Sequence, residues 1–366
     1  MHGSLRFSGF PAKKEPAIRT TIKDIAKKTG LSITTVSLVL NRKGGKFPAE
    51  TKRAVLEAVD ALNYRPNQLA ISLLTRRTHT IGLIIPDISN IFFSELAKGI
   101  ADRGRQDDYT VILCNSNDEY PLEQQCINTL ADRSVDGIIM VMSAESFGSK
   151  NKECVSVLLS LGFPVILVDC FNDSDDFSTI TIDNKQGSCL AVQHLLDLGH
   201  SRIGCISGPQ RIKTNRDRLE GYTKTLKQAN RSPEPALIYE GDFRYHGGYE
   251  GALHLLKQKP TAIFCHNDMM AIGAAKAVKE KGFSVPEDIS IIGFDDIFFT
   301  QYMDVPLSTV AQPVYHMGQE AAAVLLEEIA DGNKPKRRIM YPPRLIIRQS
   351  TAPPPSSRGP SVRLYL

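Results

Sequence analysis

The sequence has no run of eighteen apolar residues, the length at which a segment becomes a candidate for crossing a membrane as a helix. Its first twenty residues also lack the long apolar core of a secretory signal peptide. Neither export nor a membrane partner is therefore expected, and we predict a cytoplasmic protein.

Patterns for metal binding and for disulfides are also missing. The seven cysteines include no CxxC pair, and the eight histidines show no HExxH spacing. Several cysteines stand inside apolar runs such as VILC and IGCIS, which favours buried free thiols over disulfides or metal ligands. We expect no metal site and no cofactor.

Catalytic motifs are equally scarce. No GxGxxG follows an apolar run, no GxxxxGK(S/T) phosphate loop occurs, and no Ser/His/Asp or Cys/His order stands out. We therefore predict that the protein is not an enzyme. The alternative, a dehydrogenase or sugar kinase on an α/β scaffold, would be detected by a turnover assay with sugars and nucleotide cofactors.

The charge is divided unevenly along the chain. Residues 1–80 carry 15 Lys/Arg and 5 Asp/Glu, a net charge of +10, which leaves −6 on residues 81–366 because the whole chain carries +4. A basic N-terminal module on a mildly acidic body indicates a head that binds a polyanion. A solvated charged surface would give the same count, so a second indication is needed.

The basic region is predicted to be helical. Residues 20–66 fit three short helices, of which the first starts at Thr21 with Asp24 completing a Thr-x-x-Asp capping pattern. Gly30 ends this helix because only glycine takes the left-handed conformation at low cost, and Ser32 caps the second helix. Apolar residues at helical spacing predict one small core: Ile25, Ala26, Val36, Val39, Leu40, Val55, Val59 and Leu62.

Two helices around a short turn with glycine, as in TIKDIAKKTGLSITTVSLVLN, are the sequence form of a helix-turn-helix. An ordinary helical hairpin is the alternative. The second helix leaves one face free to enter a major groove, and hydroxyls at its start suit phosphate oxygens. Basic residues around it would release counterions from DNA: Lys27, Lys28, Arg42, Lys43, Lys46, Lys52 and Arg53.

A short hinge helix, residues 67–74 within YRPNQLAISLLTRRT, is predicted after the third helix. It is too short to be helical alone in water, so it should order only on DNA or against a partner copy. Leu73 would then wedge between base steps in the minor groove, or alternatively pack in a dimer. The residues expected to contact DNA are Thr21, Ser32, Ile33, Thr34, Thr35, Ser37, Leu38, Asn41, Tyr64, Asn67 and Leu73.

From residue 79 the pattern changes to apolar runs alternating with amphipathic segments. The runs that predict strands are TIGLIIP, YTVILC, DGIIMVM, PVILVD, RIGCIS, TAIFCH and ISIIGF. Fully apolar strands that alternate with helices imply parallel sheets covered on both faces, and the length favours two Rossmann-like α/β lobes. The predicted organisation is a disordered leader (1–19), a helix-turn-helix head (20–66), a hinge and linker (67–78), a two-lobed body (79–351) and a disordered tail (352–366). Between Met1 and Met140 there is no methionine that could serve as another start.

Several motifs, in their order along the chain, resemble the lactose-repressor (LacI/GalR) family of bacterial transcription regulators: TIKDIAKKTGLSITTVS, LNYRPNQLA, NIFF, RLEGY, ND and IIGFDD. The resemblance extends from Thr20 to about Thr351. It implies a sensor body of the periplasmic sugar-binding fold and a homodimer on a pseudo-palindromic DNA operator in the bacterial nucleoid. No leucine-heptad tail follows residue 351, which favours a dimer over a tetramer. Leu38 departs from the family, which often has arginine or histidine there, so the operator cannot be carried over.

The body should bind its effector at the carboxyl ends of the strands. Polar residues follow several predicted strands, among them Asp87, although such residues usually cap helices or form turns. Carboxylates, amides and aromatic faces suit a monosaccharide. By resemblance to ribose-binding proteins and to ribose or purine repressors, the effector residues are Asn90, Phe92, Phe93, Asp169, Thr214, Arg218, Phe243, Asn267, Asp295 and Gln312.

The identity of the effector stays open between several classes. A ribose-like sugar is favoured, although Cys170 stands where ribose-binding proteins have arginine. A purine would suit Thr214 and Arg218, but Ile212 replaces an expected arginine. A catabolite regulator, whose co-repressor is a phosphorylated carrier protein, is the third alternative. The expected function is a sugar-responsive repressor of a carbohydrate-utilisation operon, in which ligand-driven lobe closure changes operator affinity.

Overall fold

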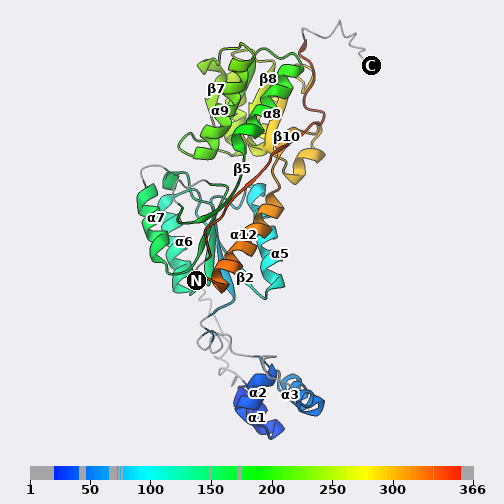
Figure 1. The fold of residues 1–366 in the computed structure, drawn as a ribbon. Helices are drawn as coiled ribbons and strands as arrows, with labels where there is room; N and C mark the ends of the chain where they lie inside the picture. Colours follow the sequence, from blue (N-terminus) through cyan, green and yellow to red (C-terminus); the bar gives the residue numbers. More distant parts are fainter. Residues whose placement is uncertain are drawn as a thin grey trace, which may run out of the picture. The chain divides into compact units, whose positions relative to one another are not determined.

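The computed structural model describes residues 20–40, 47–65, 72, 75, 77–147, 150–170, 175–332 and 334–355. The chain divides into two compact units, one ending at Thr78 and the other beginning at His79 (Figure 1). The predicted leader and most of the predicted hinge helix lie outside the described residues.

The first unit contains three helices in its described residues: α1 (Ile22–Thr29), α2 (Ile33–Leu40) and α3 (Ala49–Ala61). The backbone N–H and the hydroxyl of Thr21 both donate to Asp24 Oδ2 at 2.8 Å, which fixes the start of α1. Gly30 ends α1 with φ of +68°, the left-handed conformation that glycine adopts at least cost. These features confirm the predicted helix-turn-helix geometry.

The core of the first unit is small. Its buried residues are Ile25, Ala26, Val36, Val55 and Ala58. The other predicted core residues are half-buried and pack against this cluster: Val39, Leu40, Val59 and Leu62.

The second unit contains two six-stranded sheets, one in each lobe. The N-terminal sheet has the order β11-β5-β4-β3-β1-β2, and all its neighbouring strands are parallel. Its strands are β1 (Thr80–Ile85), β2 (Thr110–Asn115), β3 (Gly137–Met140), β4 (Val165–Val168), β5 (Ser178–Ile182) and β11 (Arg338–Tyr341).

The C-terminal sheet has the order β12-β10-β9-β8-β6-β7. It is parallel except that β12 pairs antiparallel with β10, an exception to the predicted all-parallel pattern. Its strands are β6 (Ile203–Ser207), β7 (Ile238–Glu240), β8 (Ala262–Cys265), β9 (Ser290–Asp295), β10 (Ser308–Ala311) and β12 (Arg344–Ile346).

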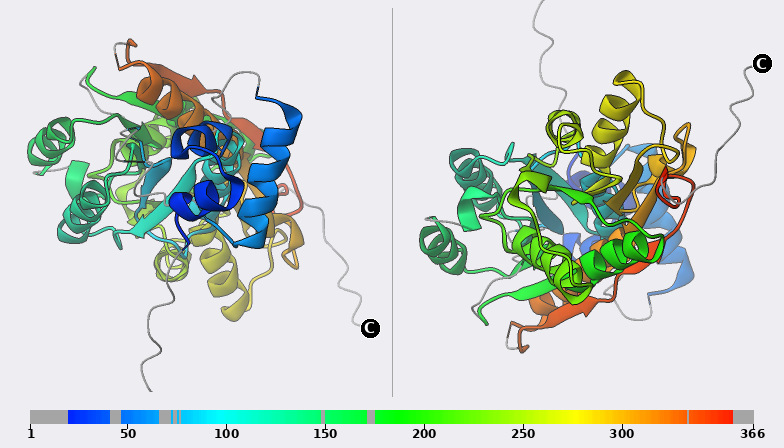
Figure 2. Two further views of the ribbon diagram at one scale, coloured as in Figure 1. Left: turned by 90° about the horizontal axis from the view of Figure 1, so that it is seen from below. Right: turned by 90° about the horizontal axis from the view of Figure 1, so that it is seen from above.

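Helices cover both faces of each sheet, which explains why the central strands are apolar throughout. The N-terminal lobe carries α5 (Ile91–Gln106), α6 (Tyr120–Asp132), α7 (Asn151–Ser160) and α12 (Val314–Ala330), with α5 beside α12 (Figure 1). The C-terminal lobe carries α8 (Asn184–Asp197), α9 (Lys213–Gln228), α10 (Tyr245–Leu256) and α11 (Asp268–Glu280), which flank its sheet in the view from above (Figure 2).

The chain crosses between the lobes three times, after β5, after β10 and after β11. The largest cluster of buried apolar residues extends through both lobes, from Ile81 in β1 to Phe264 in β8. This cluster therefore joins the lobes, while each lobe also has a buried apolar cluster and a sheet of its own.

Five short strands were not anticipated: β5, β7, β10, β11 and β12. Their sequences, such as STITI and RIMY, mix polar and apolar residues and have no long apolar run. They form because a neighbouring strand offers an unpaired edge, as when β11 pairs with β5 after the chain has passed through the whole C-terminal lobe.

The body continues beyond its predicted end at residue 351. The N–H of Ala352 donates to Ser290 Oγ at 3.0 Å, its carbonyl accepts from the same hydroxyl at 2.9 Å, and Pro354 is buried. Residues 352–355 are therefore packed on the C-terminal lobe, because strand β9 and His200 provide partners that the tail's proline-rich composition does not reveal.

All seven cysteines are free thiols; Cys154, Cys170, Cys205 and Cys265 are buried and the other three are half-buried. Among the described residues, no group of three or more His, Cys, Asp or Glu could hold a metal ion. None of the described helices is long and apolar enough to span a membrane.

Candidate functional site

The outer face of α2 is the first candidate site. Ile33 and Leu38 are 45% and 39% exposed, Thr34 is exposed, and Ser37 is half-buried beside them. Val36, on the opposite face, is fully buried in the core of the unit. The helix thus presents a free surface of the kind that a helix-turn-helix inserts into a major groove.

Hydroxyls at the start of α2 are largely committed to capping the helix. Ser32 Oγ accepts from the N–H of Thr35 at 3.0 Å, and its hydroxyl pairs with that of Thr35 at 2.9 Å. Among the other residues predicted to contact DNA, Tyr64 packs partly buried against the core of the head. Asn41, Asn67 and Leu73 lie outside the described residues.

Exposed cations lie on the two helices that pack against α2. Lys27 and Lys28 lie in the last turn of α1, and Lys52 and Arg53 lie on α3, all of them exposed. Arg53 makes only a 3.7 Å ion pair with the exposed Glu57, which is worth little in water. These cations remain available to phosphate groups.

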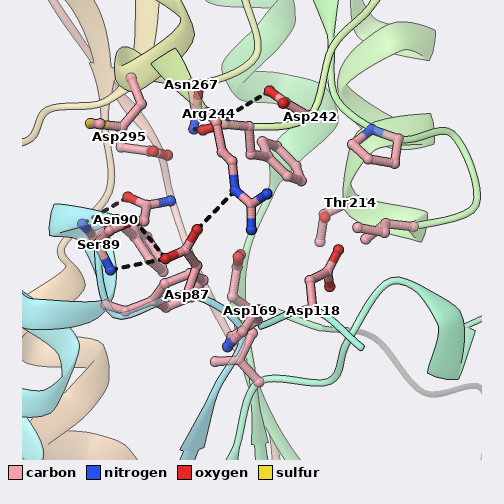
Figure 3. A pocket seen from close by; sticks show the side chains of 18 of the residues that line it. Asp87, Ser89, Asn90, Asp118, Asp169, Thr214, Asp242, Arg244, Asn267 and Asp295 are labelled. Carbon is pink, nitrogen blue, oxygen red and sulfur yellow. Dashed lines mark hydrogen bonds and ion pairs between the residues drawn. The ribbon is translucent and has the colours of Figure 1, made fainter. Parts of the chain in front are cut away.

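The second candidate site is a cavity of about 470 Å³ between the two lobes, shown in close-up in Figure 3. Its residues follow the carboxyl ends of the strands. In the N-terminal lobe, Asp87 follows β1, Asp118 follows β2 and Asp169 follows β4. In the C-terminal lobe, Asn267 follows β8 and Asp295 ends β9. The two parallel sheets thus converge on one cavity, as expected for this kind of fold.

Nine of the ten predicted effector residues line this cavity: Asn90, Phe92, Phe93, Asp169, Thr214, Arg218, Phe243, Asn267 and Asp295. Gln312 does not. Its Nε2 donates to Asp295 Oδ1 at 2.7 Å, so it positions a lining carboxylate from behind. Resemblance to a family, taken position by position, does not distinguish a residue that lines the cavity from one that supports a lining residue, because both lie close to the site.

A buried ion pair stands at the C-terminal wall. Arg218 Nη1 lies 3.8 Å from Asp295 Oδ1, both side chains are nearly inaccessible, and the guanidinium carbon lies 3.8 Å from the centre of the Phe294 ring. Arg218 also donates to Asn184 Oδ1 at 2.7 Å and to the carbonyl of His266. Burial raises the pKa of Asp295 well above its usual value, although Arg218 opposes the shift.

Asp169 has unused hydrogen-bonding capacity. Its Oδ1 is buried and has no hydrogen-bond partner within the described part of the chain. Burial raises the pKa of Asp169 to about 6, with the nearby Arg218 acting in the opposite direction. An unsatisfied carboxylate oxygen on a cavity wall costs free energy unless a ligand or water donates to it.

Asn90 and Asn267 each cap a helix and also line the cavity, two roles that the sequence presented as alternatives. The side-chain oxygen of Asn90 accepts from the N–H of Phe92 at 3.1 Å, and that of Asn267 accepts from the N–H of Met270 at 2.9 Å. Both residues therefore cap helices that point into the cavity. Phe92 and Phe93, packed edge to face 5.2 Å apart, are likewise core residues that also line the cavity.

The structure adds Arg244, which was not predicted, to the residues that line the cavity, and pairs it with Asp87. Asp87 Oδ2 accepts from Arg244 Nε at 3.0 Å, and this is the one ion pair that joins the lobes among the described residues (Figure 3). Burial opposes the shift, but hydrogen bonds from Ser89 and Arg244 hold the pKa of Asp87 below its usual value. Arg244 follows β7, a strand too short to predict, so no sequence signal marked it.

Asp118 could have been found by the rule that identified its neighbours, because it follows the predicted strand YTVILC. Its Oδ1 accepts from the N–H of Ala144 at 2.7 Å, and burial raises its pKa. Cys170, the mismatch with ribose-binding proteins, is fully buried under the N-terminal sheet and is not among the residues that line the cavity. Its thiol does not face the cavity, and the guanidinium that ribose-binding proteins have at this position is absent.

Comparisons with known proteins agree with both sites. Residues 21–67 match the profile of bacterial regulatory proteins of the lacI family, and residues 192–351 match that of a periplasmic binding protein-like domain. The transcriptional repressor PurR of Aliivibrio salmonicida is 35% identical over 334 residues, which cover 90% of this chain and 98% of that protein.

Solved structures show the same arrangement. The lac repressor dimer bound to operator and an anti-inducer has a TM-score of 0.81 at 27% identity, covering 91% of this chain and 99% of that one. A regulator from Enterococcus faecium with bound ribose has a TM-score of 0.68 at 33% identity, covering 75% of this chain and 99% of that one. These relatives are transcription regulators and not enzymes, which removes the enzyme alternative. The chain therefore belongs to the LacI family of bacterial regulatory proteins and is a DNA-binding transcription regulator.

Proposed function

We propose that the protein represses a carbohydrate-utilisation operon and that a small ribose-like sugar, bound between the two lobes, controls its affinity for DNA. It would act as a homodimer on a pseudo-palindromic operator, as the dimeric, operator-bound lac repressor suggests. A ligand that binds one degree of lobe closure better than another must shift that equilibrium. The shift would reach the head through the segment before His79.

The unpartnered Oδ1 of Asp169 carries this proposal. Sugar hydroxyls are donors that satisfy such an oxygen, and Asn267 and Asp295 offer further polar groups on the facing wall. Phe92, on the N-terminal wall, offers an aromatic face to the C–H surface of a sugar ring. The ribose bound to the similar Enterococcus regulator supports this ligand class.

A purine is the second candidate, and the relatives support it with equal weight. The PurR repressor of Aliivibrio salmonicida is 35% identical to this chain over 90% of its length. The ribose-bound Enterococcus regulator is 33% identical over 75%. Thr214 and Arg218, which suit a purine by resemblance, both line the cavity. Ile212 also lines it and contributes an apolar surface where the resemblance expects arginine.

Calorimetric titration of the full chain separates the two classes. We expect ribose, or another monosaccharide in a panel, to bind in the titration and to raise the melting temperature in a thermal unfolding experiment. The purine bases hypoxanthine and guanine should show no binding and should leave the melting temperature unchanged. Asp169→Asn should weaken sugar binding at least tenfold, because the amide presents a donor where the sugar needs an acceptor. Tight binding of a purine base without sugar binding would replace this proposal by the purine alternative.

The carrier-protein alternative needs its own measurement. The regulator CcpA of Lactococcus lactis has a TM-score of 0.68 at 28% identity. If neither sugars nor purines bind, operator affinity should be measured with and without a phosphorylated carrier protein. A large increase in affinity would then identify a co-repressor of that kind.

A further inference from the structure

The recognition helix α2 carries no side chain capable of bidentate base recognition. Its sequence, ITTVSLVL, contains no arginine, lysine, asparagine, glutamine or acidic residue. Those side chains distinguish guanine, adenine and cytosine by hydrogen bonds in the major groove. Base recognition by this helix must therefore depend on other contacts.

Two apolar side chains dominate the free face instead. Ile33 and Leu38 stay 45% and 39% exposed and do not belong to the core of the head. They flank Thr34 and Ser37, so the apolar pair lies diagonally across the surface that faces DNA. Exposed apolar groups on a strongly basic module need a partner that is both anionic and locally apolar.

Hydroxyl groups supply little of the discrimination. Ser32 and Thr35 are engaged with one another at the start of the helix. The hydroxyl of Thr34 is exposed, but a single hydroxyl both donates and accepts and so distinguishes the bases poorly. This leaves apolar contact as the selective interaction.

The major groove offers one apolar group, the C5-methyl of thymine. We propose that Ile33 and Leu38 read thymine methyl groups, so that each operator half-site has thymine at the base pairs under these two side chains and no obligatory guanine there. This inference depends on DNA binding by the head and is independent of the effector.

The test uses uracil, which lacks only the methyl group of thymine. Duplexes selected from a random library by the full chain would be resynthesised with each thymine replaced in turn by deoxyuridine, and binding would be measured by fluorescence anisotropy. We expect one or two positions per half-site at which uracil weakens binding roughly fourfold, the value of one buried methyl-sized group. Uracil should be neutral at the remaining positions.

Side-chain variants assign the contacts. Leu38→Ala should abolish the preference for thymine over uracil at one position, and Ile33→Ala at another. Leu56→Ala is the control, because Leu56 is an exposed leucine (55%) that lies on α3 instead of α2 and should leave both ratios unchanged. Because all three side chains are exposed, circular dichroism should show the head folded in each variant.

A gain of function completes the test. Leu38→Arg should shift the selected base under this side chain from thymine to guanine, since arginine can pair with its O6 and N7 atoms. The proposal is wrong if uracil is neutral at every position, or if the wild-type half-site requires guanine under α2 and Leu38→Ala leaves that requirement intact.

Discussion

Because Asp295 is paired with Arg218, a substitution of Asp295 should affect both effector binding and stability. Asp295 contributes to the cavity and also balances a buried guanidinium that touches the Phe294 ring. Removing one partner of a buried pair leaves an uncompensated charge, which usually costs about 3–5 kcal/mol. Loss of response and loss of stability must therefore be separated.

We predict that Asp295→Ala abolishes the response to the effector and lowers the free energy of unfolding by about 3 kcal/mol. Asp295→Asn should abolish the response with a smaller loss of stability, because the amide still accepts from Gln312. Urea unfolding and a gel-shift titration measure the two effects. A normal effector response in Asp295→Asn would show that the cavity is wrongly assigned.

Asp169 predicts a pH dependence of effector binding. Its raised pKa, about 6, means that the folded protein holds a proton there at pH 5, where an unfolded aspartate is ionised. If sugar hydroxyls donate to the carboxylate, affinity should be constant above pH 7 and fall up to tenfold for each pH unit below 6. Calorimetry from pH 5 to 8 measures this, with Asp169→Asn as the pH-insensitive control. Affinity that rises on acidification would contradict the assigned role.

The raised pKa of Asp169 makes folding stability depend on pH in the opposite direction to effector binding. Because the folded pKa of Asp169 lies above that of the unfolded chain, its contribution to stability is largest below about pH 4 and is lost as the pH rises through 6. Asp169 is thus least favourable for folding at the pH at which it is best suited to bind a ligand.

Helix crossings at glycine hold the body together at the scale of secondary structure. A Cβ at Gly99 of α5 would lie 2.1 Å from the carbonyl oxygen of Tyr315 in α12, and one at Gly318 would lie 2.4 Å from that of Leu96. The C-terminal lobe repeats the arrangement, where Gly248 of α10 meets the backbone of α11. These close contacts exclude any side chain at the crossing.

We expect Gly99→Ala to lower the free energy of unfolding by at least about 2 kcal/mol, since two backbones must separate to accommodate a methyl group. Gly332→Ala is the matched control, because a Cβ there meets nothing within 4 Å. Thermal unfolding of both variants provides the comparison. Equal melting temperatures would show that α5 and α12 separate without cost.

At the scale of the whole body, the salt bridge between Asp87 and Arg244 links lobes that must move relative to one another for the proposed mechanism. Their side chains are 21% and 56% exposed, so solvent screens the pair and its contribution should stay below about 1 kcal/mol. Such a weak salt bridge favours the arrangement of the lobes in which it forms, without preventing the lobes from moving apart. Both residues line the cavity, so breaking the salt bridge should ease the opening of the lobes around a bound ligand.

We predict that Arg244→Gln accelerates release of the effector up to about fivefold while changing stability little. Asp87→Asn should act similarly, and the double variant should add nothing further if the two residues act only on each other. Stopped-flow displacement measures the rates. Additive effects in the double variant would show that the two residues act separately.

Local sequence patterns are enough to predict the division of the protein into head and body and most of its chemistry. Charge separates the head from the body, Thr21 and Gly30 mark the ends of α1, and the apolar runs set the central strands, because capping, turn conformation and burial are properties of short segments. Because ligands bind beyond the carboxyl ends of parallel strands, the sequence also predicts that Asp169, Asn267 and Asp295 lie at one site, and all three line the cavity.

Which residues act together depends on the three-dimensional fold. Strands β11 and β12 exist because distant edges accept them, Gln312 supports Asp295 from behind, and Arg244 reaches Asp87 although 157 positions separate them. Cys170, the mismatch with ribose-binding proteins, is buried in the core. The physical reason is common to all four: a strand edge, an ion pair and a cavity wall each need partners brought together by the path of the chain, and no local pattern encodes that path.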